Sequence, residues 1–330
     1  MTKSNDTLQM DSASIPSSIP PSRIAVLIPC HNEELTVAQV VADFRAALPS
    51  ASIYVFDNNS SDATTAIALR AGAQVRQVPL KGKGNVVRRM FADIEADAYV
   101  LVDGDDTYEA AAAPAMVAKL FDEHLDTVIG VRKPVHAEVH RPGHAFGNAM
   151  LSGFLSLLFG SRCADILSGY RVFSRRFVKS FPVLSSGFEI ETELTVHALE
   201  LKLPSAEVAT AFKDRPEGSA SKLSTFRDGF RILGTMLRLF STERPLLFYG
   251  IWAFGLAALA VILTVPLLFT YAQTGLVPRF PTGILATGLM ILAALSFFAG
   301  LILDTVTRGR RETRFLAYLS CPEPHSHPDS

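Results

Sequence analysis

Two carboxylates, Asp103 and Asp105, follow directly after the apolar run AYVLV at residues 98–102. In an extended chain, residues i and i+2 project to the same face, so both carboxylates are expected to point at one spot. Two hard oxygen ligands suit Mg²⁺ or Mn²⁺ bridging a diphosphate, whose own oxygens complete the coordination shell. Gly104, between them, is expected to let a ligand approach the backbone. A solvated acidic turn is the alternative interpretation.

Asp57 ends a second apolar run, SIYVFD at 52–57, in the same way. Its carboxylate could accept hydrogen bonds from a nucleobase or a ribose, and an Asx-type turn is the alternative. Lys83 lies in the glycine-containing segment GKGN at 82–85, which resembles a phosphate loop. This segment lacks the third glycine of G-x-G-x-x-G and does not follow the first strand, so the pattern does not favour a dinucleotide-binding site.

Strands alternating with helices are expected to position these groups. The apolar runs predict strands at 23–29, 52–57, 74–78, 98–102 and 127–131, with a helix over 84–95. This alternation predicts an α/β fold with a largely parallel, doubly wound sheet. Ligands of such sheets bind beyond the carboxyl ends of the strands, where the acidic turns lie.

The apolar residues are concentrated near the C-terminus. Hydrophobic residues make up 48% of the 330-residue chain, and residues 246–272 and 282–303 carry no charge. At about 1.5 Å per residue, the first stretch reaches roughly 40 Å, enough to cross a bilayer with tilt. Two transmembrane helices are therefore predicted, with a buried hairpin of a soluble protein as the alternative. The net charge of −1 excludes a nucleic-acid binder that relies on bulk positive charge.

The arginines that flank these stretches predict the orientation in the membrane. Arg238 and Arg244 precede the first stretch, and the arginines of RGRRETR follow the second. The positive-inside rule then places both termini and the N-terminal domain on the cytoplasmic face of the membrane.

The remaining segments predict two tails and two interfacial helices. Residues 1–22 are expected to form a disordered tail and residues 305–330 a cytoplasmic tail. Residues 225–244 form an amphipathic pattern and residues 147–160 an apolar one, and both suit helices lying in the membrane interface. Packing of these segments against the sheet is the alternative. Three cysteines are too few and too scattered for a disulfide framework.

The order of the motifs PCHNEE, FDNNSSDAT, KGKGN, VDGDD and DILSGYR resembles a family 2 glycosyltransferase with the GT-A fold. With the two spans, the chain is similar to the dolichyl-phosphate-mannose-synthase-like, polyprenyl-phosphate branch, over about residues 23–240 plus the hairpin. The resemblance implies a Rossmann-like GT-A domain at 23–224. It also implies an inverting transferase that uses Mg²⁺ or Mn²⁺ and moves a sugar from a UDP- or GDP-linked donor to a polyprenyl phosphate in the bilayer.

The resemblance also assigns roles to individual residues. It assigns nucleotide-sugar binding to Pro29, Asn32, Glu33, Asp57, Lys83 and Asp103. It assigns metal binding to Asp103 and Asp105, and catalysis to Asp105, Asp165 and Arg171. It assigns binding of the lipid phosphate and the donor diphosphate to Arg132, Arg141, Ser168, Arg215, Ser219 and Lys222. Thr107 stands where this branch often has glutamine, which puts a contribution of that position to the metal in doubt.

The acceptor decides whether a general base is needed. A monophosphate is largely dianionic at pH 7, so Asp165 is expected to position the sugar or Arg171, with a base role as the alternative. Two other functions stay open. One is a membrane glycosyltransferase that uses a sugar hydroxyl in polysaccharide synthesis, although the Q-x-x-R-W motif is absent and Trp252 is the only tryptophan. The other is a non-enzymatic nucleotide-binding membrane scaffold. The sequence leaves the sugar, the polyprenol and homo-oligomerisation undetermined.

Overall fold

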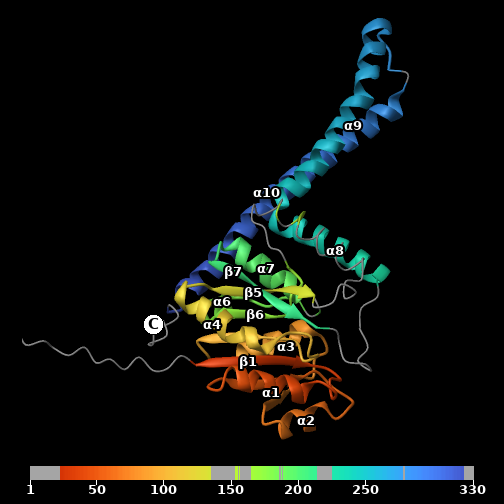
Figure 1. Cartoon of the computed structure of the whole chain (residues 1–330). Helices are drawn as coiled ribbons and strands as arrows, with labels where there is room; N and C mark the ends of the chain where they lie inside the picture. The colour runs from red at the N-terminus through yellow and green to blue at the C-terminus, as the bar shows by residue number, and fades with distance from the viewer. Residues whose placement is uncertain are drawn as a thin grey trace, which may run out of the picture.

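The computed structural model describes residues 23–134, 153–154, 156, 165–185, 187, 189–213, 225–277 and 279–322, and for residues 134 and 225–233 it describes the backbone alone. The tail at 1–22, most of 147–160, and the predicted phosphate ligands Arg141, Arg215, Ser219 and Lys222 lie outside these ranges. The domain is built on a seven-stranded sheet of order β3-β2-β1-β4-β6-β5-β7 (Figure 1). Its strands are β1 Ile24–Cys30, β2 Ser52–Asp57, β3 Gln74–Gln77, β4 Ala98–Leu101, β5 Thr127–Pro134, β6 Arg171–Ser174 and β7 Ser205–Phe212.

The α/β fold with a mostly parallel sheet is confirmed, with one antiparallel strand inside it. β6 pairs antiparallel with both β4 and β5, whereas β1 pairs parallel with β2 and β4. The helices of the domain are α1 Val37–Ala47, α2 Thr64–Arg70, α3 Lys83–Asp93, α4 Ala113–Asp122, α6 Arg175–Ser180 and α7 Ile190–Glu200, with a 3₁₀ turn η1 Ala110–Ala112. The predicted strand and helix bounds in 23–131 agree with these to within a few residues.

Alternate residues of each central strand enter separate cores on the two faces of the sheet, as a period of two requires. Val26 and Ile28 of β1 pack with Phe44 of α1 in one core, and Leu27 packs with Met90 of α3 in the other. Both faces are therefore covered, and the strand ends are the part of the sheet left for a ligand.

The parallel register brings the polar strand ends together. Cys30 of β1 pairs with Asp57 of β2, and Leu27 of β1 pairs with Leu101 of β4. The turn after β4 folds so closely onto β1 that a Cβ on Gly104 would lie 2.6 Å from Cys30 Sγ. Gly104 is therefore needed for packing against β1.

The amphipathic helix predicted at 225–244 is present as α8, Thr225–Glu243. Met236 is buried, and Leu239 and Phe240 pack with it against Ile129 and Val196 of the domain. This half of α8 therefore covers the domain, which was the alternative for this segment. Leu237, on the other side of the helix, is 51% exposed.

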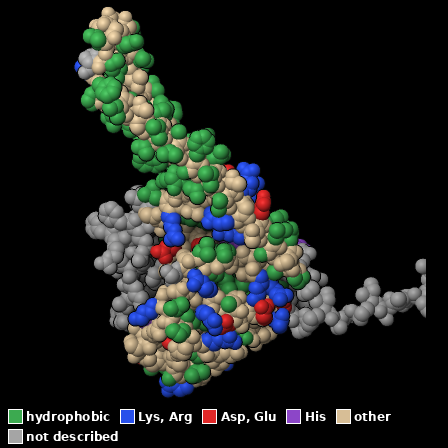
Figure 2. All heavy atoms as spheres, turned by 180° about the vertical axis from the view of Figure 1, so that it is seen from behind, with side chains coloured by type: hydrophobic (Ala, Val, Ile, Leu, Met, Phe, Trp, Pro, Cys, Tyr) green, Lys and Arg blue, Asp and Glu red, His purple; other side chains and the backbone are tan. Residues whose placement is uncertain are grey.

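Among the residues that the structure describes, two helices are long and apolar enough to cross a membrane, in the positions that the sequence predicts. They are α9 Pro245–Thr274 and α10 Phe280–Leu319, and they form a hairpin that projects from the domain (Figure 1). Hydrophobic side chains cover the length of the hairpin, whereas acidic and basic side chains gather over the domain (Figure 2). Helices with these properties also occur in the cores of soluble proteins, but little of either span is buried here.

Residues 305–319 of the predicted cytoplasmic tail continue α10 without a break. Arg311 and Arg314 on this extension form ion pairs with Glu200 of α7. The Tyr318 hydroxyl donates to Asp126 at 2.9 Å. Glu200 and Asp126 are both buried, so the extension fixes the hairpin to the domain through pairs that sequence spacing does not reveal.

Small residues at intervals of seven form the contact between α9 and α10. Ala253 and Ala260 of α9 and Ala286, Ala293 and Gly300 of α10 are buried. A period of seven keeps one seam facing the partner helix, and small side chains let helix backbones approach closely in membranes. At Gly300 an added Cβ would lie 3.0 Å from Tyr249 Cβ and 3.4 Å from Pro245 O.

Gly300→Leu is therefore expected to force the helices apart and to destabilise the hairpin by about 1–3 kcal/mol. The measurement is the midpoint of thermal unfolding in detergent, followed by the fluorescence of Trp252 on α9. A lower midpoint than that of the wild type is expected. The control is Gly288→Leu on the same helix, because no described atom lies within 4 Å of a Cβ there. Equal midpoints for the two variants would contradict this packing.

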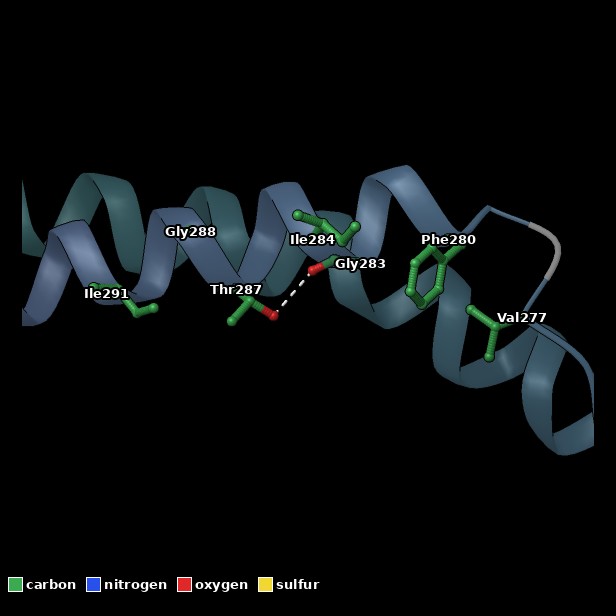
Figure 3. A pocket seen from close by; sticks show the side chains of 7 residues that line it. All are labelled: Val277, Phe280, Gly283, Ile284, Thr287, Gly288 and Ile291. Carbon is green, nitrogen blue, oxygen red and sulfur yellow. Dashed lines mark hydrogen bonds between the residues drawn. The ribbon is translucent and has the colours of Figure 1, made fainter.

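An open groove of about 550 Å³ lies near the tip of the hairpin. Val277, Phe280, Ile284 and Ile291 line it together with two glycines and Thr287 (Figure 3). The Thr287 hydroxyl donates to Gly283 O at 3.0 Å, so even this polar group is satisfied within the helix. The groove lies at the opposite end of the hairpin from the domain and has the lining of a lipid-facing surface.

Candidate active site

Lys83 lies between two carboxylates at the carboxyl end of the sheet. Its Nζ is 2.5 Å from Asp103 Oδ1, after β4, and 2.5 Å from Glu191 Oε1, in the first turn of α7. Burial by itself lowers the pKa of Lys83, but the two carboxylates outweigh it and raise the pKa above its usual value, so the ammonium stays charged. The structure thus joins the predicted residues Lys83 and Asp103 in one cluster.

Glu191 is a member of this cluster that the sequence argument missed. It lies in the segment GFEIETEL at 187–194, where acidic residues in a first helical turn are explained by the helix dipole alone. Its side chain is nevertheless 8% exposed and paired with Lys83. Only the packing of α7 beside α3 distinguishes it from its neighbour Glu193.

Gly169 leaves the space that the Asp103 carboxylate occupies. A Cβ at this position would lie 2.8 Å from Asp103 Cγ and closer still to Oδ2. The Gly169 N–H donates to the Tyr108 hydroxyl at 2.9 Å, which fixes the backbone at this distance. The loop before β6 therefore limits where the Asp103 carboxylate of the D-x-D motif can lie.

Gly169→Ala is expected to displace the Asp103 carboxylate and lower turnover by about 10²-fold, the cost typical of misplacing a reacting group by an ångström. Steady-state turnover at saturating donor would measure this. Gly234→Ala is the matched control, because no described atom lies within 4 Å of a Cβ there. Full turnover in Gly169→Ala would show that Asp103 does not need its present position.

Asp105 is buried and oriented by the residue two positions later. The Thr107 hydroxyl donates to Asp105 Oδ1 at 2.6 Å, and the Thr107 N–H lies 3.3 Å from the same oxygen. The turn is fixed by the hydroxyl of Thr36, the residue before α1, which donates to Gly104 O at 2.7 Å. Thr107 thus orients the Asp105 carboxylate.

The donor set at this turn fits Mg²⁺ or Mn²⁺. Burial raises the pKa of Asp103, the Lys83 ammonium opposes this rise, and the negative charge of Asp105 adds to it. A further cation bound here would balance the negative charge of the two neighbouring carboxylates. Both carboxylates supply hard oxygen ligands, which suit these cations. The described residues hold no group of three or more metal-ligating side chains, so additional ligands would have to come from a bound diphosphate or water.

Asp165 and Arg132 form a bidentate pair. Arg132 Nε and Nη2 donate to the two carboxylate oxygens at 2.7 Å each, and the Arg132 N–H lies 3.3 Å from Oδ2. The guanidinium also lies over the ring of Phe212, 5.4 Å from its centroid. From the sequence, Asp165 is expected to position the sugar or Arg171. In the structure, Asp165 is paired with Arg132.

Arg171 and Ser168 are inside the protein. Arg171 is 1% exposed and donates to Ile166 O at 2.5 Å, Ser168 O at 3.0 Å and Thr195 Oγ1 at 2.9 Å. The Ser168 hydroxyl is completely buried and donates to Gly130 O at 2.6 Å. These bonds hold the loop before β6, so both side chains position the site, and the phosphate contact expected of Ser168 does not fit its burial.

The loop after β1 is bonded to the loop after β2. Asn32, at a φ of 56°, donates its N–H to Ser60 Oγ at 2.9 Å and accepts from Ser61 N at 2.8 Å. The Glu33 N–H donates to Thr64 Oγ1 at 2.9 Å. Pro29 is half-buried at the end of β1 beside them. The predicted residues Pro29, Asn32, Glu33 and Asp57 therefore lie together on one pair of neighbouring strand ends.

This chain is similar to several known proteins of one family. The model of glycosyl transferase family 2 matches residues 25–181. Glycosyltransferase AglJ of Haloferax volcanii is 35% identical over 257 residues, which cover 76% of this chain and 82% of that protein. A dolichyl-phosphate hexose transferase of the same organism is 25% identical over 221 residues, covering 67% of this chain and 95% of that protein.

A solved structure shows the same fold. Glucosyl-3-phosphoglycerate synthase from Mycobacterium tuberculosis, in complex with Mn²⁺, uridine-diphosphate and phosphoglyceric acid, matches with a TM-score of 0.54 at 22% identity, covering 67% of this chain and 78% of that one. Together with the family match and the 35% identical relative, this confirms the resemblance that the motifs indicated. The chain belongs to glycosyltransferase family 2 and is a glycosyltransferase with the GT-A fold.

Proposed function

We propose that this glycosyltransferase is anchored in the membrane and transfers a sugar, with inversion, from a nucleotide-diphosphate sugar to a polyprenyl phosphate on the cytoplasmic face. The observation that carries the proposal is the pair of Arg132 and Asp165, which engages both carboxylate oxygens of Asp165. A carboxylate held in this way is a poor general base. A phosphate acceptor needs none because its second pKa is near 6, whereas a sugar hydroxyl does.

On the donor side, the chain's own groups bind and orient the diphosphate and the sugar. Asp103 and Asp105 would hold Mg²⁺ or Mn²⁺, which when bound neutralises charge that develops on the leaving diphosphate. Lys83 adds a buried positive charge beside Asp103. The carboxylates of Asp103 and Glu191, which flank Lys83, offer acceptors for sugar hydroxyls.

On the acceptor side, Arg132 is the described cation best placed for a phosphate. Its pair with Asp165 uses Nε and Nη2, and the Nη1 group takes no part in it. Arg141, Arg215, Ser219 and Lys222 remain predicted phosphate ligands. Attack of a phosphate oxygen on C1 in a single displacement breaks the bond to the diphosphate and inverts the anomeric configuration.

The hairpin and its flanks support this membrane placement. Arg308, Arg310, Arg311 and Arg314 follow the second span, and the positive-inside rule puts this end of the hairpin in the cytoplasm. The domain lies at the same end (Figure 1). The similarity to a dolichyl-phosphate hexose transferase supports a lipid-phosphate acceptor.

The test is transfer by the purified full chain in detergent with undecaprenyl phosphate, UDP- and GDP-sugars, and Mg²⁺ or Mn²⁺. Product is expected only with the phosphorylated lipid, and not with the matched polyprenol that lacks phosphate. Transfer to free sugar hydroxyls without transfer to the lipid phosphate would establish the alternative, a hydroxyl-acceptor enzyme of polysaccharide synthesis. Anomeric proton NMR of the product checks the inversion.

A further inference from the structure

In the described part of the chain, neither α9 nor the domain covers one face of α10. The buried positions Ala286, Ala293, Gly300 and Thr307 recur every seven residues on the side that meets α9 and α8. On the opposite side, exposed residues recur at alternating intervals of three and four, and Ala299 among them is half-buried. We call these residues the outer face of α10: Leu292, Leu295, Ala299, Ile302, Val306, Gly309, Thr313, Leu316 and Ser320.

The outer face continues past the membrane. α10 has 40 residues, which reach roughly 60 Å, whereas a hydrocarbon core is only about 30 Å thick. The uncharged part of the span ends at Leu303, and the helix then runs along the edge of the domain (Figure 1). Leu316, in this last part, is 66% exposed. Lipid tails can cover the outer face within the span, but they do not reach Leu316.

Charged residues are absent from the outer face where it leaves the membrane. Six of the eleven residues from Asp304 to Arg314 are charged, but Val306, Gly309 and Thr313 are not. Two of the cations point to the other side of the helix, where they pair with Glu200 of the domain. A helix face that meets only water can carry charge, so its exclusion indicates contact with another uncharged helix face.

Gly309 is not explained by the packing of a single chain. Glycine is unfavourable inside a helix, and no described atom lies within 4 Å of a Cβ added at this position. The described chain therefore has room for a larger residue here. Small residues on a helix face let the backbone of another helix approach closely.

We infer that the outer face of α10 binds the same face of a second copy of this chain, in a parallel pair related by a two-fold axis. Alternating intervals of three and four residues are those of a two-stranded coiled coil, and a two-fold axis brings each face onto its own equivalent. The partner needs an uncharged helix face that leaves the bilayer at the same depth, and a second α10 has one. Both copies enter the membrane in the same direction, so their helices run parallel. The inference goes beyond the proposed reaction and shares with it only the membrane anchoring.

The first experiment is disulfide cross-linking of the full chain in membranes, with Thr313→Cys as the probe in a Cys163→Ser, Cys321→Ser background. Oxidation is expected to convert most of this variant into a covalent dimer on a non-reducing gel, because equivalent outer-face residues meet at the two-fold axis. The control is Arg308→Cys on another side of the same helix, where the side chain is 73% exposed. It is expected to stay monomeric.

Absence of a dimer from Thr313→Cys overturns the proposal, and would mean that something other than a second copy covers the outer face. Equal dimer yields from Thr313→Cys and Arg308→Cys also overturn it, because they would indicate random collisions in the membrane.

The second experiment adds Gly309→Trp to the Thr313→Cys chain. The indole has room in the single chain but not between two closely packed helices, so the dimer yield is expected to fall at least about fivefold. Gly234→Trp on α8 is the matched control, because no described atom lies within 4 Å of a Cβ there either. It is expected to leave the yield unchanged, and circular dichroism checks the fold of both variants. An undiminished yield with Gly309→Trp overturns the contact along the outer face.

Failure of this inference and failure of the proposed function are distinguishable. Cross-linking is measured without donor or acceptor, so absence of transfer to polyprenyl phosphate leaves the dimer standing. A monomer that transfers sugar to polyprenyl phosphate overturns the dimer and leaves the proposed function standing.

Discussion

Asp105→Asn is expected to lower sugar transfer by about 10²–10³-fold without unfolding the protein. The substitution removes the charge that binds the metal, but asparagine keeps an oxygen that can accept from the Thr107 hydroxyl, now 2.6 Å from Oδ1. The fold of the turn is therefore preserved while the metal loses a ligand. Turnover and the Mg²⁺ or Mn²⁺ dependence of UDP and GDP binding measure the two effects, and circular dichroism checks the fold.

The adjacent residue supplies the control. Asp106 lies in the same turn with its carboxylate 3.8 Å from Lys213 Nζ, and its φ of 57° is one that asparagine tolerates. Asp106→Asn is therefore expected to keep metal dependence and most of the turnover. Equal losses in both variants would mean that net negative charge in the turn, rather than a specific ligand, supports transfer.

Arg171→Met is expected to lower the free energy of unfolding by about 3 kcal/mol. The change removes three hydrogen bonds and leaves the buried carbonyl groups of Ile166 and Ser168 without this donor. Urea unfolding in detergent, followed by circular dichroism, measures the loss. Arg89→Met, at a side chain that is 58% exposed and paired with Asp93, should change stability by less than about 1 kcal/mol.

Activity is expected to fall along with stability, because Arg171 is joined to the donor site. It donates to Thr195 Oγ1, and the Thr195 hydroxyl donates to Glu191 O at 3.0 Å. Glu191 in turn holds Lys83. Wild-type stability combined with loss of turnover would instead support the direct catalytic contact that the sequence predicted for Arg171.

The parts of this protein that depend on neighbouring residues in the chain could be predicted from the sequence. The strand before Asp103, the alternation of strands and helices, and the two apolar spans follow from local hydrophobic patterns. The carboxyl ends of parallel strands meet at one edge, so Asp57, Asp103 and Asp105 could be assigned to one site without coordinates. The family resemblance assigned binding roles to Lys83 and Arg132, because it too is carried by short segments of neighbouring residues.

The tertiary structure alone decided which charged groups pair and which are buried. Glu191 and Glu193 have the same type and local setting, and the packing of α7 brings only one of them to Lys83. Asp165 pairs with Arg132 rather than Arg171 because the loop before β6 turns Arg171 into the core. The segment RGRRETR has the composition of a solvated tail, yet it is part of α10, and its Arg311 and Arg314 form ion pairs with Glu200. Ion pairs between residues as far apart as Glu200 and Arg314 follow from chain topology, which hydrophobic periodicity does not encode.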